Sequence, residues 1–512
     1  MAQSSAHAPL LHIGTADEFA RVRSGLQAAG FDEETICHTL KIEGMSDIGG
    51  INLGEVDFTN VSEQLQLLIR LFFSQRLVRR ADVERVLDQG ILNAFLSLGI
   101  LGTGEFGADN FYARVLLYPV AEFLMASDRH TNPDGSEFSS TPDIVFPAIY
   151  GGTLRFIQLL PQSPAEQALD LCAGTGIGAF VLSRCSKRAV SSDVTERASH
   201  FALFNRALNN LGNVDVVCGD LYDAVAGKTF DRIVAHPPYV PSLGIAAIWR
   251  DGGTTGELLV RRIIEGLPQH LRAGGVSCIV SIGLDTKEGK FEDRARNYLK
   301  DSADEFDIIF AGTNERTPDE VLHDLSERDP SLGQEGLLKL KEAFDDAGIV
   351  RMPYGALVMR RHAVRERHQA WTLRTRLSDQ TDGSDFERSF NLHSRFSQSD
   401  FVKTLAQSRP VLAPRLQVKV THVVYERALL PAEYIFETDK PFTAFGRVDG
   451  WMVPLFTRFD GSLTTAEIYD KARIEAELPD GFGLDDFARL VARMIERGFL
   501  ILPDPAADDI GA

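Results

Sequence analysis

The distribution of apolar and polar positions divides the chain into three regions. In the first, the segment "VSEQLQLLIRLFF" has apolar residues every three or four positions, and this spacing predicts an amphipathic helix. Its apolar face comprises Leu65, Leu68, Ile69 and Phe72. Two shorter helical patterns follow at 82–87 and 91–98, and the segment 111–128 is typical of two strands. We therefore expect residues 1–140 to form a helical domain with a β-hairpin, in the manner of a winged helix.

The middle region, residues 141–364, alternates short apolar strands with helical patterns. Such alternation indicates the α/β class, with a mostly parallel sheet covered by helices on both faces. A charged helical insertion is expected at 318–347, before the last strand. The predicted strands are 168–171, 189–192, 214–217, 232–235, 276–282, 306–311 and 357–359.

The third region, residues 365–512, begins within an arginine-rich run. Residues 360–376 hold six arginines, two histidines and a single acidic residue. Because charge runs are usually solvated, we expect a solvated connection between domains. A contact surface for an acidic partner is the alternative.

The end of the third region has the order helix, helix, strand, after a strand pattern at 416–428. Thr464 and Glu467 have the spacing of a capping box, which predicts the start of the first helix. The second helix is predicted at 484–497, where Gly498 stops it, and an apolar strand follows at 499–502. This order predicts a winged-helix-like C-terminal end.

Composition and charge exclude several classes of function. No stretch reaches the roughly eighteen apolar residues of a membrane helix, so we expect a cytoplasmic protein without membrane contact. The formal net charge is −19, with 72 acidic residues against 53 basic ones. Nucleic acid is therefore a disfavoured partner, because its binding depends on neutralising phosphates. The five cysteines are scattered without Cys-x-x-Cys pairs, so neither a metal site nor a disulfide framework is predicted.

The strongest chemical signal is "ALDLCAGTGIGAFVLSR". An apolar strand leads to Asp170, a glycine turn follows, and a helix starts near Ile177. Glycines allow the backbone to turn tightly and to approach a ligand without Cβ atoms. Asp193, at the end of the next strand, is placed to accept hydrogen bonds from ribose hydroxyls, and Asp220 suits an adenine amine.

Two nucleotide ligands compete for this turn. The dinucleotide fingerprint fits only loosely, because the third glycine comes one position early. S-adenosylmethionine (SAM) fits better, since a Pro-Pro-aromatic turn in "FDRIVAHPPYVPS" closes the fourth strand and would form an acceptor pocket beside the methyl donor. A second glycine pattern, "GTGEFG" at 102–107, follows a helix rather than a strand, so we interpret it as a loop.

The middle region, from Phe146 to about Met359, resembles class I SAM-dependent methyltransferases. Within them it is most similar to the glutamine side-chain amide methyltransferases that act on release factors. The motifs that carry the resemblance are "DLCAGTGIG", "SSDVTERASHFALFNRALNNLG", "GDLYDAVAGKTFDRIVAHPPYVPS" and "RDGGTTGELLVRRIIEGLPQHLRAGG". The resemblance implies a Rossmann-like seven-stranded core, SAM as the cofactor and an active methyltransferase.

The resemblance also assigns residues to the two sides of the site. The implied cofactor contacts are Asp170, Cys172, Gly174, Thr175, Gly176, Gly178, Asp193, Val194, Asp220, Leu221 and His236. The implied catalytic residues are His236, Pro237, Pro238 and Tyr239. We expect substrate contacts from Tyr239, from Tyr150 ahead of the core, and from Trp249 and Asp251 in the loop after the turn.

His236 departs from the family pattern, which has Asn before the two prolines. Asn offers an acceptor and a donor together, whereas neutral His offers one of each on opposite ring edges and can take a proton near pH 7. We hypothesise that His236 acts as a general base for an acceptor that loses a proton. The alternative is a histidine that only hydrogen-bonds backbone at a strand end.

The leading functional hypothesis is methyl transfer to a nitrogen or oxygen of a small metabolite or peptide in a biosynthetic pathway. Protein glutamine methylation is the second hypothesis, and nucleic-acid methylation, which the net charge disfavours, is the third. From a different class of function, the chain could be a non-catalytic SAM-binding scaffold. The C-terminal end resembles small winged-helix peptide-recognition domains and also plain dimerisation wings. We favour a scaffold or a homodimer contact, because fold analogy alone does not give function.

Overall fold

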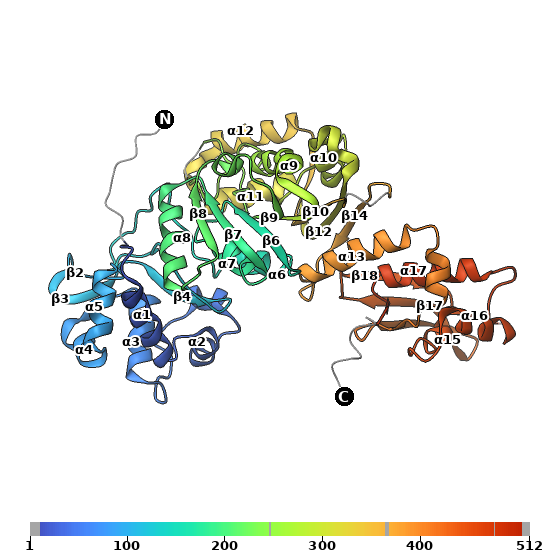
Figure 1. Cartoon of the computed structure of the whole chain (residues 1–512), viewed down its shortest axis with the longest axis horizontal. Coiled ribbons are helices and arrows are strands. Elements are labelled where there is room, and N and C mark those ends of the chain that lie inside the picture. The colour runs from blue at the N-terminus through green and yellow to red at the C-terminus, as the bar shows by residue number, and fades with distance from the viewer. Residues whose placement is uncertain (1–10, 245–246, 364–367, 476, 504–512) are drawn as a thin grey trace.

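The computed structural model describes residues 11–244, 247–363, 368–475 and 477–503. A central region with a large sheet lies between a helical N-terminal region and a C-terminal region that extends to the other side (Figure 1). Among the described residues, no helix is both long and apolar enough to span a membrane.

In the N-terminal region, helices alternate with short strands. The helix α3 buries all four residues of the predicted apolar face. The strands β1, β3 and β2 pair in that order. The interpretation of "GTGEFG" as a loop is correct only for Glu105 and Phe106, which form a turn, since residues 102–104 end β2 and Gly107 begins β3. The elements are α1 (Ala16–Ala28), α2 (Glu33–Leu40), η1 (Met45–Gly50), α3 (Glu63–Phe72), β1 (Val78–Arg79), α4 (Arg80–Val86), α5 (Gln89–Ser97), β2 (Leu101–Gly104), β3 (Gly107–Ala113), β4 (Leu116–Val120) and β5 (Phe123–Ser127).

The central region begins with α6 and contains the large sheet. Its elements up to the fifth strand are α6 (Gly151–Gln158), β6 (Ala165–Leu171), α7 (Ile177–Leu182), β7 (Ser186–Asp193), α8 (Glu196–Leu208), β8 (Val214–Cys218), η2 (Leu221–Val225), β9 (Phe230–Ala235), α9 (Leu258–His270) and β10 (Leu271–Ile282). The remaining elements are β11 (Asp285–Thr286), α10 (Phe291–Tyr298), η3 (Lys300–Glu305), β12 (Phe306–Arg316), α11 (Pro318–Arg328), η4 (Pro330–Leu332), α12 (Gly333–Asp346), β13 (Ile349–Arg361) and β14 (Thr372–Arg376).

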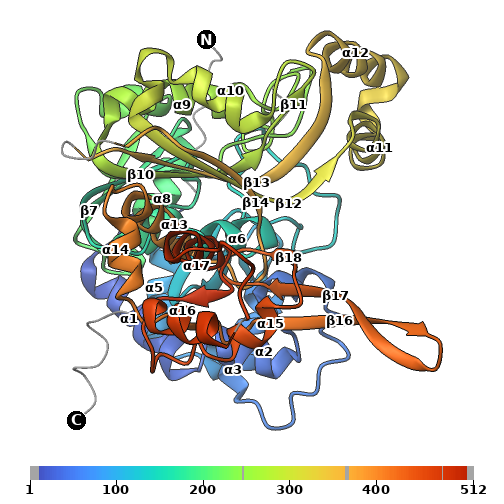
Figure 2. The same cartoon turned by 90° about the vertical axis from the view of Figure 1, so that its right-hand side faces the viewer.

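Within the described residues the sheet has the strand order β14-β12-β13-β10-β9-β6-β7-β8. Strands β8, β7, β6, β9 and β10 are parallel, whereas β13 runs antiparallel to both β10 and β12. The expected Rossmann-like core of seven strands is therefore confirmed, and β14 extends it by one strand at the β12 edge. The predicted insertion forms α11 and α12, which lie beyond the ends of β12 and β13 (Figure 2).

The arginine-rich run is not a solvated connection where the structure describes it. Arg374, on β14, binds Asp285 at 2.6 Å and Glu292 at 3.0 Å, and Arg361 binds Glu305 at 2.6 Å. Charge alone predicts exposure, but these arginines have carboxylate partners on neighbouring elements of the same domain. Residues 364–367 of the run lie outside the described residues.

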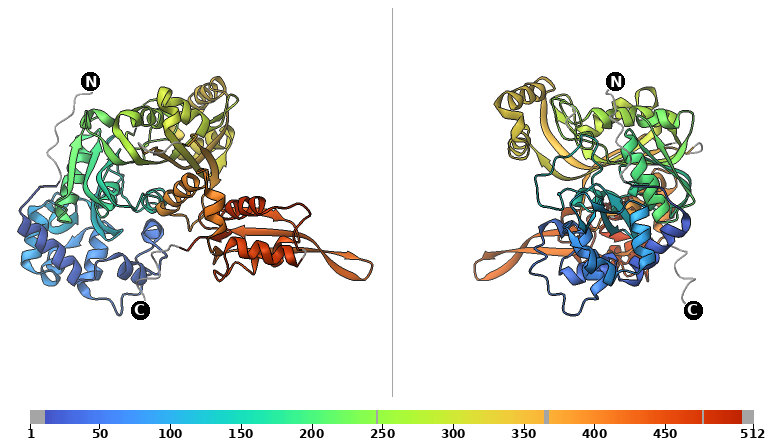
Figure 3. Two further views of the ribbon diagram at one scale, coloured as in Figure 1. Left: turned by 45° about the vertical axis from the view of Figure 1, so that its right-hand side comes forward. Right: turned by 90° about the vertical axis from the view of Figure 1, so that its left-hand side faces the viewer.

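The C-terminal region has its own apolar core. The capping box of Thr464 and Glu467 is present at the start of α16, as predicted. The hairpin of β16 and β17 projects away from the rest of the molecule (Figure 3). The elements are α13 (Gly383–Phe396), α14 (Phe401–Ala406), β15 (Val411–Leu412), β16 (Gln417–Tyr425), β17 (Ala428–Thr438), β18 (Ala444–Val448), α15 (Met452–Phe456), α16 (Thr465–Ile474), α17 (Leu484–Glu496) and β19 (Leu500–Ile501).

Candidate active site

The motifs found in the sequence meet at the carboxyl edge of the parallel strands. Leu171, at the end of β6, is paired with Ser192 on β7 and with Ala235 on β9. The glycine turn, the end of β7 and the Pro-Pro turn therefore leave the sheet side by side. Ligands of open α/β sheets bind at this edge.

Asp170 supports the glycine turn from below. Its Oδ2 accepts a hydrogen bond from the Ala179 N–H at 2.9 Å, near the start of α7. A Cβ on Gly178 would lie 2.6 Å from the same oxygen, which explains the glycine at this position. Burial raises the pKa of Asp170 to about 8, against the effect of the Ala179 hydrogen bond. A cationic ligand such as SAM would favour its ionised form.

Gly174 and Gly176 turn the chain with φ of 54° and 89°, in the left-handed region that favours glycine. A Cβ on Gly174 would meet nothing within 4 Å, so the backbone there is open to a ligand. Thr175, between them, is buried, and its carbonyl accepts a hydrogen bond from Asn205 Nδ2 at 3.1 Å. The turn thus has the shape that a bound nucleotide requires.

Asp193 joins the end of β7 to the glycine turn. Its Oδ2 accepts from the Gly174 N–H at 2.9 Å, and its Oδ1 accepts from the Thr195 N–H at 3.0 Å. Burial raises the pKa of Asp193, although both hydrogen bonds oppose this. Val194 beside it is 53% exposed.

Cys172 lies among the three carboxylates. Burial raises the pKa of its thiol, and the negative charges of Asp193, Asp170 and Asp220 raise it further. Asp220 is exposed and binds Arg262 of α9 at 2.9 Å, while Leu221 after it is buried, with φ of 49°. The structure therefore brings the predicted cofactor residues into one neighbourhood.

His236 follows β9 directly, and its ring lies between other aromatic rings. It stacks on Phe156 of α6 with 5.5 Å between ring centroids, and the Tyr239 ring is 5.9 Å away. The Nε2 atom of His236 is buried without a hydrogen-bond partner among the described residues. Burial lowers the pKa of His236 to about 4, so the ring is neutral at pH 7.

Tyr354 of β13 completes this aromatic group, and sequence reasoning missed it. Its ring centroid is 5.4 Å from that of Tyr239. Its hydroxyl is buried and makes no hydrogen bond of regular geometry in the described part of the chain, but burial and its interaction with Tyr239 both raise its pKa. A Cβ on Gly152 would lie 3.5 Å from this hydroxyl and 3.8 Å from His236 Nε2, so the two atoms flank one point. No local motif marks Tyr354, because it joins the site only through the pairing of β13 with β10.

Two predicted substrate residues, Tyr150 and Trp249, share one aromatic stack. Phe146 stacks on Tyr150 at 4.6 Å and on Trp249 at 4.3 Å. Tyr150 is 39% exposed and Trp249 is 40% exposed, so both present ring surface to solvent. The stack joins the segment before α6 to the loop after the Pro-Pro turn.

Asp251 holds this loop together from within. Its Oδ2 accepts from the Ala247 N–H at 2.9 Å, and its Oδ1 accepts from Arg250 Nε at 3.1 Å. A Cβ on Gly252 would lie 2.7 Å from Tyr239 Cα, and one on Gly256 would lie 2.3 Å from the Tyr239 carbonyl oxygen. The glycines after Asp251 thus let the loop pack against the backbone of the Pro-Pro-Tyr turn.

Comparisons with known proteins agree with this geometry. Residues 148–294 match the Methyltransferase small domain family. The chain is 30% identical over 132 residues to a release factor glutamine methyltransferase of Thermodesulfovibrio yellowstonii, covering 23% of this chain and 47% of that protein. It is 32% identical over 173 residues to a ribosomal protein uL3 glutamine methyltransferase of Bordetella pertussis, covering 30% and 55%. The chain spans about half the length of these relatives.

Among solved structures, a methyltransferase from Pyrococcus furiosus is 15% identical, with a TM-score of 0.26 and coverage of 41% of this chain and 80% of that one. The fold assignment rests on the strand order and on the family match. We conclude that the chain carries a class I SAM-dependent methyltransferase domain, and that S-adenosyl-L-methionine is its cofactor.

Proposed function

We propose that this enzyme transfers the methyl group of SAM to the side-chain amide nitrogen of glutamine in a peptide or protein. The observation that carries the proposal is the state of His236: a neutral ring beside the cofactor edge, with a buried and unpartnered Nε2. The likeness to glutamine methyltransferases supports the same acceptor.

A neutral His236 can make one of the hydrogen bonds to an amide that the family's Asn makes. Its unprotonated nitrogen accepts one hydrogen bond from an amide N–H and so orients the amide. The Tyr354 hydroxyl, close to the same point, can donate to the amide oxygen. An unpartnered buried acceptor beside a buried hydroxyl without a regular hydrogen bond is a complementary pair for a primary amide, which has both an N–H donor and a carbonyl acceptor.

The general-base hypothesis for His236 loses support. A base is most effective when its pKa lies near the working pH, and burial lowers the pKa of His236 to about 4. An acceptor that must give up its proton before attack, such as an amine or a thiol, would gain little from so weak a base. As the N–C bond to the amide forms and the S–C bond of SAM breaks, S-adenosylhomocysteine leaves. The proton on the methylated nitrogen is then strongly acidic and passes to water without a strong base.

The residues of this chain set the geometry of the transfer. Asp193 holds the glycine turn, whose backbone contacts the cofactor. His236 and Tyr354 orient the acceptor. The half-buried Tyr239 packs between them, and the exposed rings of Tyr150 and Trp249 offer contact surface to the chain that bears the glutamine. SAM supplies the methyl group from its sulfonium.

The test is methyl transfer from SAM labelled in the methyl group to fractions of a lysate of the source organism. Label in the protein or peptide fraction that acid hydrolysis releases as volatile methylamine supports the amide. Label that stays on an amino acid, or label in the small-metabolite fraction, contradicts it and supports the other acceptor predicted from sequence, a heteroatom of a small metabolite or peptide. SAM binding without any label supports the non-catalytic scaffold.

We propose further that the end regions are winged-helix-like and serve as a scaffold or as homodimer contacts. In the N-terminal region, α3, β1, α4, α5, β2 and β3 follow one another in winged-helix order. In the C-terminal region, β19 follows α16 and α17 and pairs with β15. Light scattering on the full chain tests the dimer: a mass of twice 56.5 kDa supports it, and a monomer contradicts it.

A further inference from the structure

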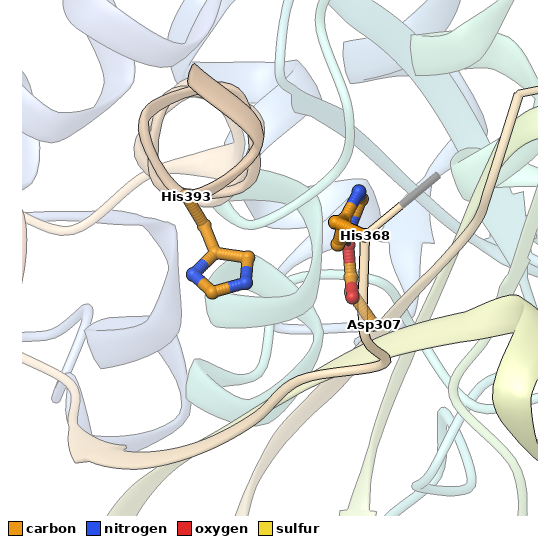
Figure 4. A group of neighbouring side chains, drawn as sticks. All are labelled: Asp307, His368 and His393. Atoms are coloured by element: carbon orange, nitrogen blue, oxygen red, sulfur yellow. Dashed lines mark hydrogen bonds and ion pairs between the residues drawn. The ribbon is translucent and has the colours of Figure 1, made fainter. Parts of the chain in front are cut away.

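A second cluster of titratable side chains lies where the methyltransferase sheet meets the C-terminal region, away from the cofactor edge. Asp307 on β12 is fully buried, with a side-chain exposure of 0%. His362 follows β13, His368 lies in the connection to β14, and His393 is on α13. Figure 4 shows the His393 ring extending from its helix towards Asp307 and His368.

Asp307 is the centre of the cluster. Its Oδ2 accepts from His368 Nε2 at 2.8 Å and from Arg360 Nη2 at 3.0 Å. Its Oδ1 accepts from His362 Nε2 at 3.0 Å and from the Trp371 N–H at 3.1 Å. Burial alone would raise the pKa of Asp307, but these donors hold it below its usual value. The carboxylate is therefore ionised.

His368 has a ring nitrogen that its hydrogen bond to Asp307 leaves free. When His368 Nε2 donates to the carboxylate, its Nδ1 keeps a lone pair. That Nδ1 is buried and has no hydrogen-bond partner among the described residues, on a side chain that is 4% exposed. An ion shared by Asp307 and His368 must replace the proton between Asp307 Oδ2 and His368 Nε2, because Nδ1 lies on the opposite edge of the ring. The free Nδ1 then takes up the ring proton.

His393 is also in the form that binds a metal. Burial lowers its pKa, so the ring is neutral at pH 7, and neutral imidazole is the ligand form. Its ring stacks on Trp371 at 4.2 Å, which sets its plane. Within the described residues it makes no hydrogen bond to the carboxylate, and the contact of its Nε2 with Ser397 Oγ is long, at 3.5 Å.

The three side chains are close enough to share one ion. One ligand atom from each of Asp307, His368 and His393 lies within 4.8 Å of the other two. Zinc bonds to nitrogen and oxygen are about 2.0–2.2 Å long, so two ligands of one ion lie roughly 3–4 Å apart. The upper limit of 4.8 Å exceeds this spacing by about 1 Å, so the three ligands would have to draw together when an ion binds.

We propose that Asp307, His368 and His393 form a site for a divalent transition metal of the zinc class, which ties α13 to the methyltransferase sheet. Two imidazoles and one carboxylate suit zinc, cobalt or nickel rather than magnesium or calcium. The sequence predicted no metal because that prediction rested on cysteine spacing, and these three residues come from distant elements. The site adds a structural role beside the proposed methyl transfer and does not depend on it.

Arg360 provides the competing explanation. Its guanidinium pairs with Asp307 and packs over Phe390 with 5.1 Å to the ring centroid, so the carboxylate has a cationic partner without a metal. If the histidines only donate hydrogen bonds to Asp307, the cluster is a polar anchor and binds no ion.

The test uses the untagged full chain, stripped with a chelator and titrated with Co²⁺ and with Zn²⁺. We expect about one equivalent of Co²⁺ to bind with visible absorption bands, Zn²⁺ to displace it, and Zn²⁺ to raise the melting temperature. His393→Phe keeps a ring on Trp371 but removes a ligand, and should weaken Co²⁺ binding at least about tenfold. The matched control, His323→Ala, changes an exposed histidine on α11 and should bind as the wild type does.

Two results would overturn the proposal. One is a wild type that binds no stoichiometric Co²⁺ or Zn²⁺, which leaves the Arg360 anchor as the explanation. The other is His393→Phe with the affinity of the wild type, which places any bound ion elsewhere. Because the His393 ring is only partly buried and the substitution keeps its stack, the variant should fold, and its melting temperature without metal checks this.

Discussion

The cofactor side and the acceptor side of the site differ in how their polar groups are satisfied. On the cofactor side, Asp170 and Asp193 accept hydrogen bonds from the backbone of the glycine turn and of α7. On the acceptor side, His236 Nε2 and the Tyr354 hydroxyl are buried without regular hydrogen bonds in the described residues. Buried polar groups are normally hydrogen-bonded, so unpartnered ones need an explanation. The polar groups of the cofactor side are hydrogen-bonded within the protein, whereas those of the acceptor side lack regular hydrogen bonds, and the proposed function assigns them to the acceptor.

The largest effect should follow from a substitution on the cofactor side, where the polar groups are hydrogen-bonded within the protein. Gly178→Val places carbon atoms against Asp170 Oδ2, where even a Cβ would lie at 2.6 Å. The glycine turn must then shift, and we expect the affinity for SAM to fall at least about a hundredfold, or about 2.8 kcal/mol. Calorimetric titration with SAM measures this.

The control for that variant is Gly212→Ala, because a Cβ there meets nothing within 4 Å. It should bind SAM as the wild type does. Equal SAM affinity in Gly178→Val and Gly212→Ala would show that the turn does not depend on the packing of Asp170 against α7.

A smaller effect should follow on the acceptor side. Tyr354→Phe removes a buried hydroxyl whose interaction with Tyr239 is not a hydrogen bond of regular geometry, so the free enzyme should lose little stability. If the hydroxyl meets the acceptor, kcat/KM should fall about fivefold, the effect of one hydrogen bond of about 1 kcal/mol. Methyl transfer and thermal unfolding, measured together, separate the two quantities.

Tyr469→Phe is the control for Tyr354→Phe, because it removes a hydroxyl that is hydrogen-bonded within the protein and lies outside the candidate site. The Tyr469 hydroxyl donates to the Phe482 carbonyl at 3.2 Å in the C-terminal region. We expect this variant to lose about 1 kcal/mol of stability and no activity. Should Tyr354→Phe behave in the same way, the Tyr354 hydroxyl is structural and the contrast between the two sides fails.

A further prediction concerns Asp170 and pH. Its folded-state pKa of about 8 lies above the usual value, so the folded protein holds this proton more tightly than the unfolded chain does. The resulting stability is present in full below about pH 4 and is lost as the pH rises towards 8. The Asp170→Asn variant has no carboxyl group to ionise at this position, so its stability should not fall in this way as the pH rises.

Melting temperatures at pH 5 and pH 8 without SAM check the prediction. The wild type should fall by a few degrees more than Asp170→Asn between these two values. Parallel changes in the two proteins would mean that Asp170 is ionised in the free enzyme.

The same contrast explains what the sequence could predict. Asp170, the glycines and Asp193 lie on consecutive strands and turns, where the pattern strand, turn, helix is local, and the structure places them as expected. Phe156 on α6 stacks on His236, and Tyr354 on β13 contacts Tyr239. No spacing in the sequence links α6 or β13 to the Pro-Pro turn. The lowered pKa of His236 results from that packing, so the residue type alone suggested a base.

The edge of the sheet was harder to predict for a different reason. β14 has the sequence Thr-Leu-Arg-Thr-Arg, and its arginines indicated a solvated segment. The carboxylate partners of Arg374 lie on β11 and α10, so only the folded sheet shows that this charge is neutralised there. The pattern of apolar and polar residues predicts a strand poorly when buried ion pairs replace apolar contacts.

The central claim is that His236 acts as a neutral hydrogen-bond acceptor for an amide. The most direct test is the pH dependence of kcat/KM, from pH 5.5 to 8.5, for methyl transfer to the labelled acceptor by the wild type and by His236→Asn. Because the pKa of His236 is about 4, the account predicts a flat wild-type profile across this range. It also predicts substantial activity for His236→Asn with the same flat profile. A wild-type rate that rises through a midpoint between pH 6 and 7, and loses that midpoint in His236→Asn, would contradict the account and restore the general base.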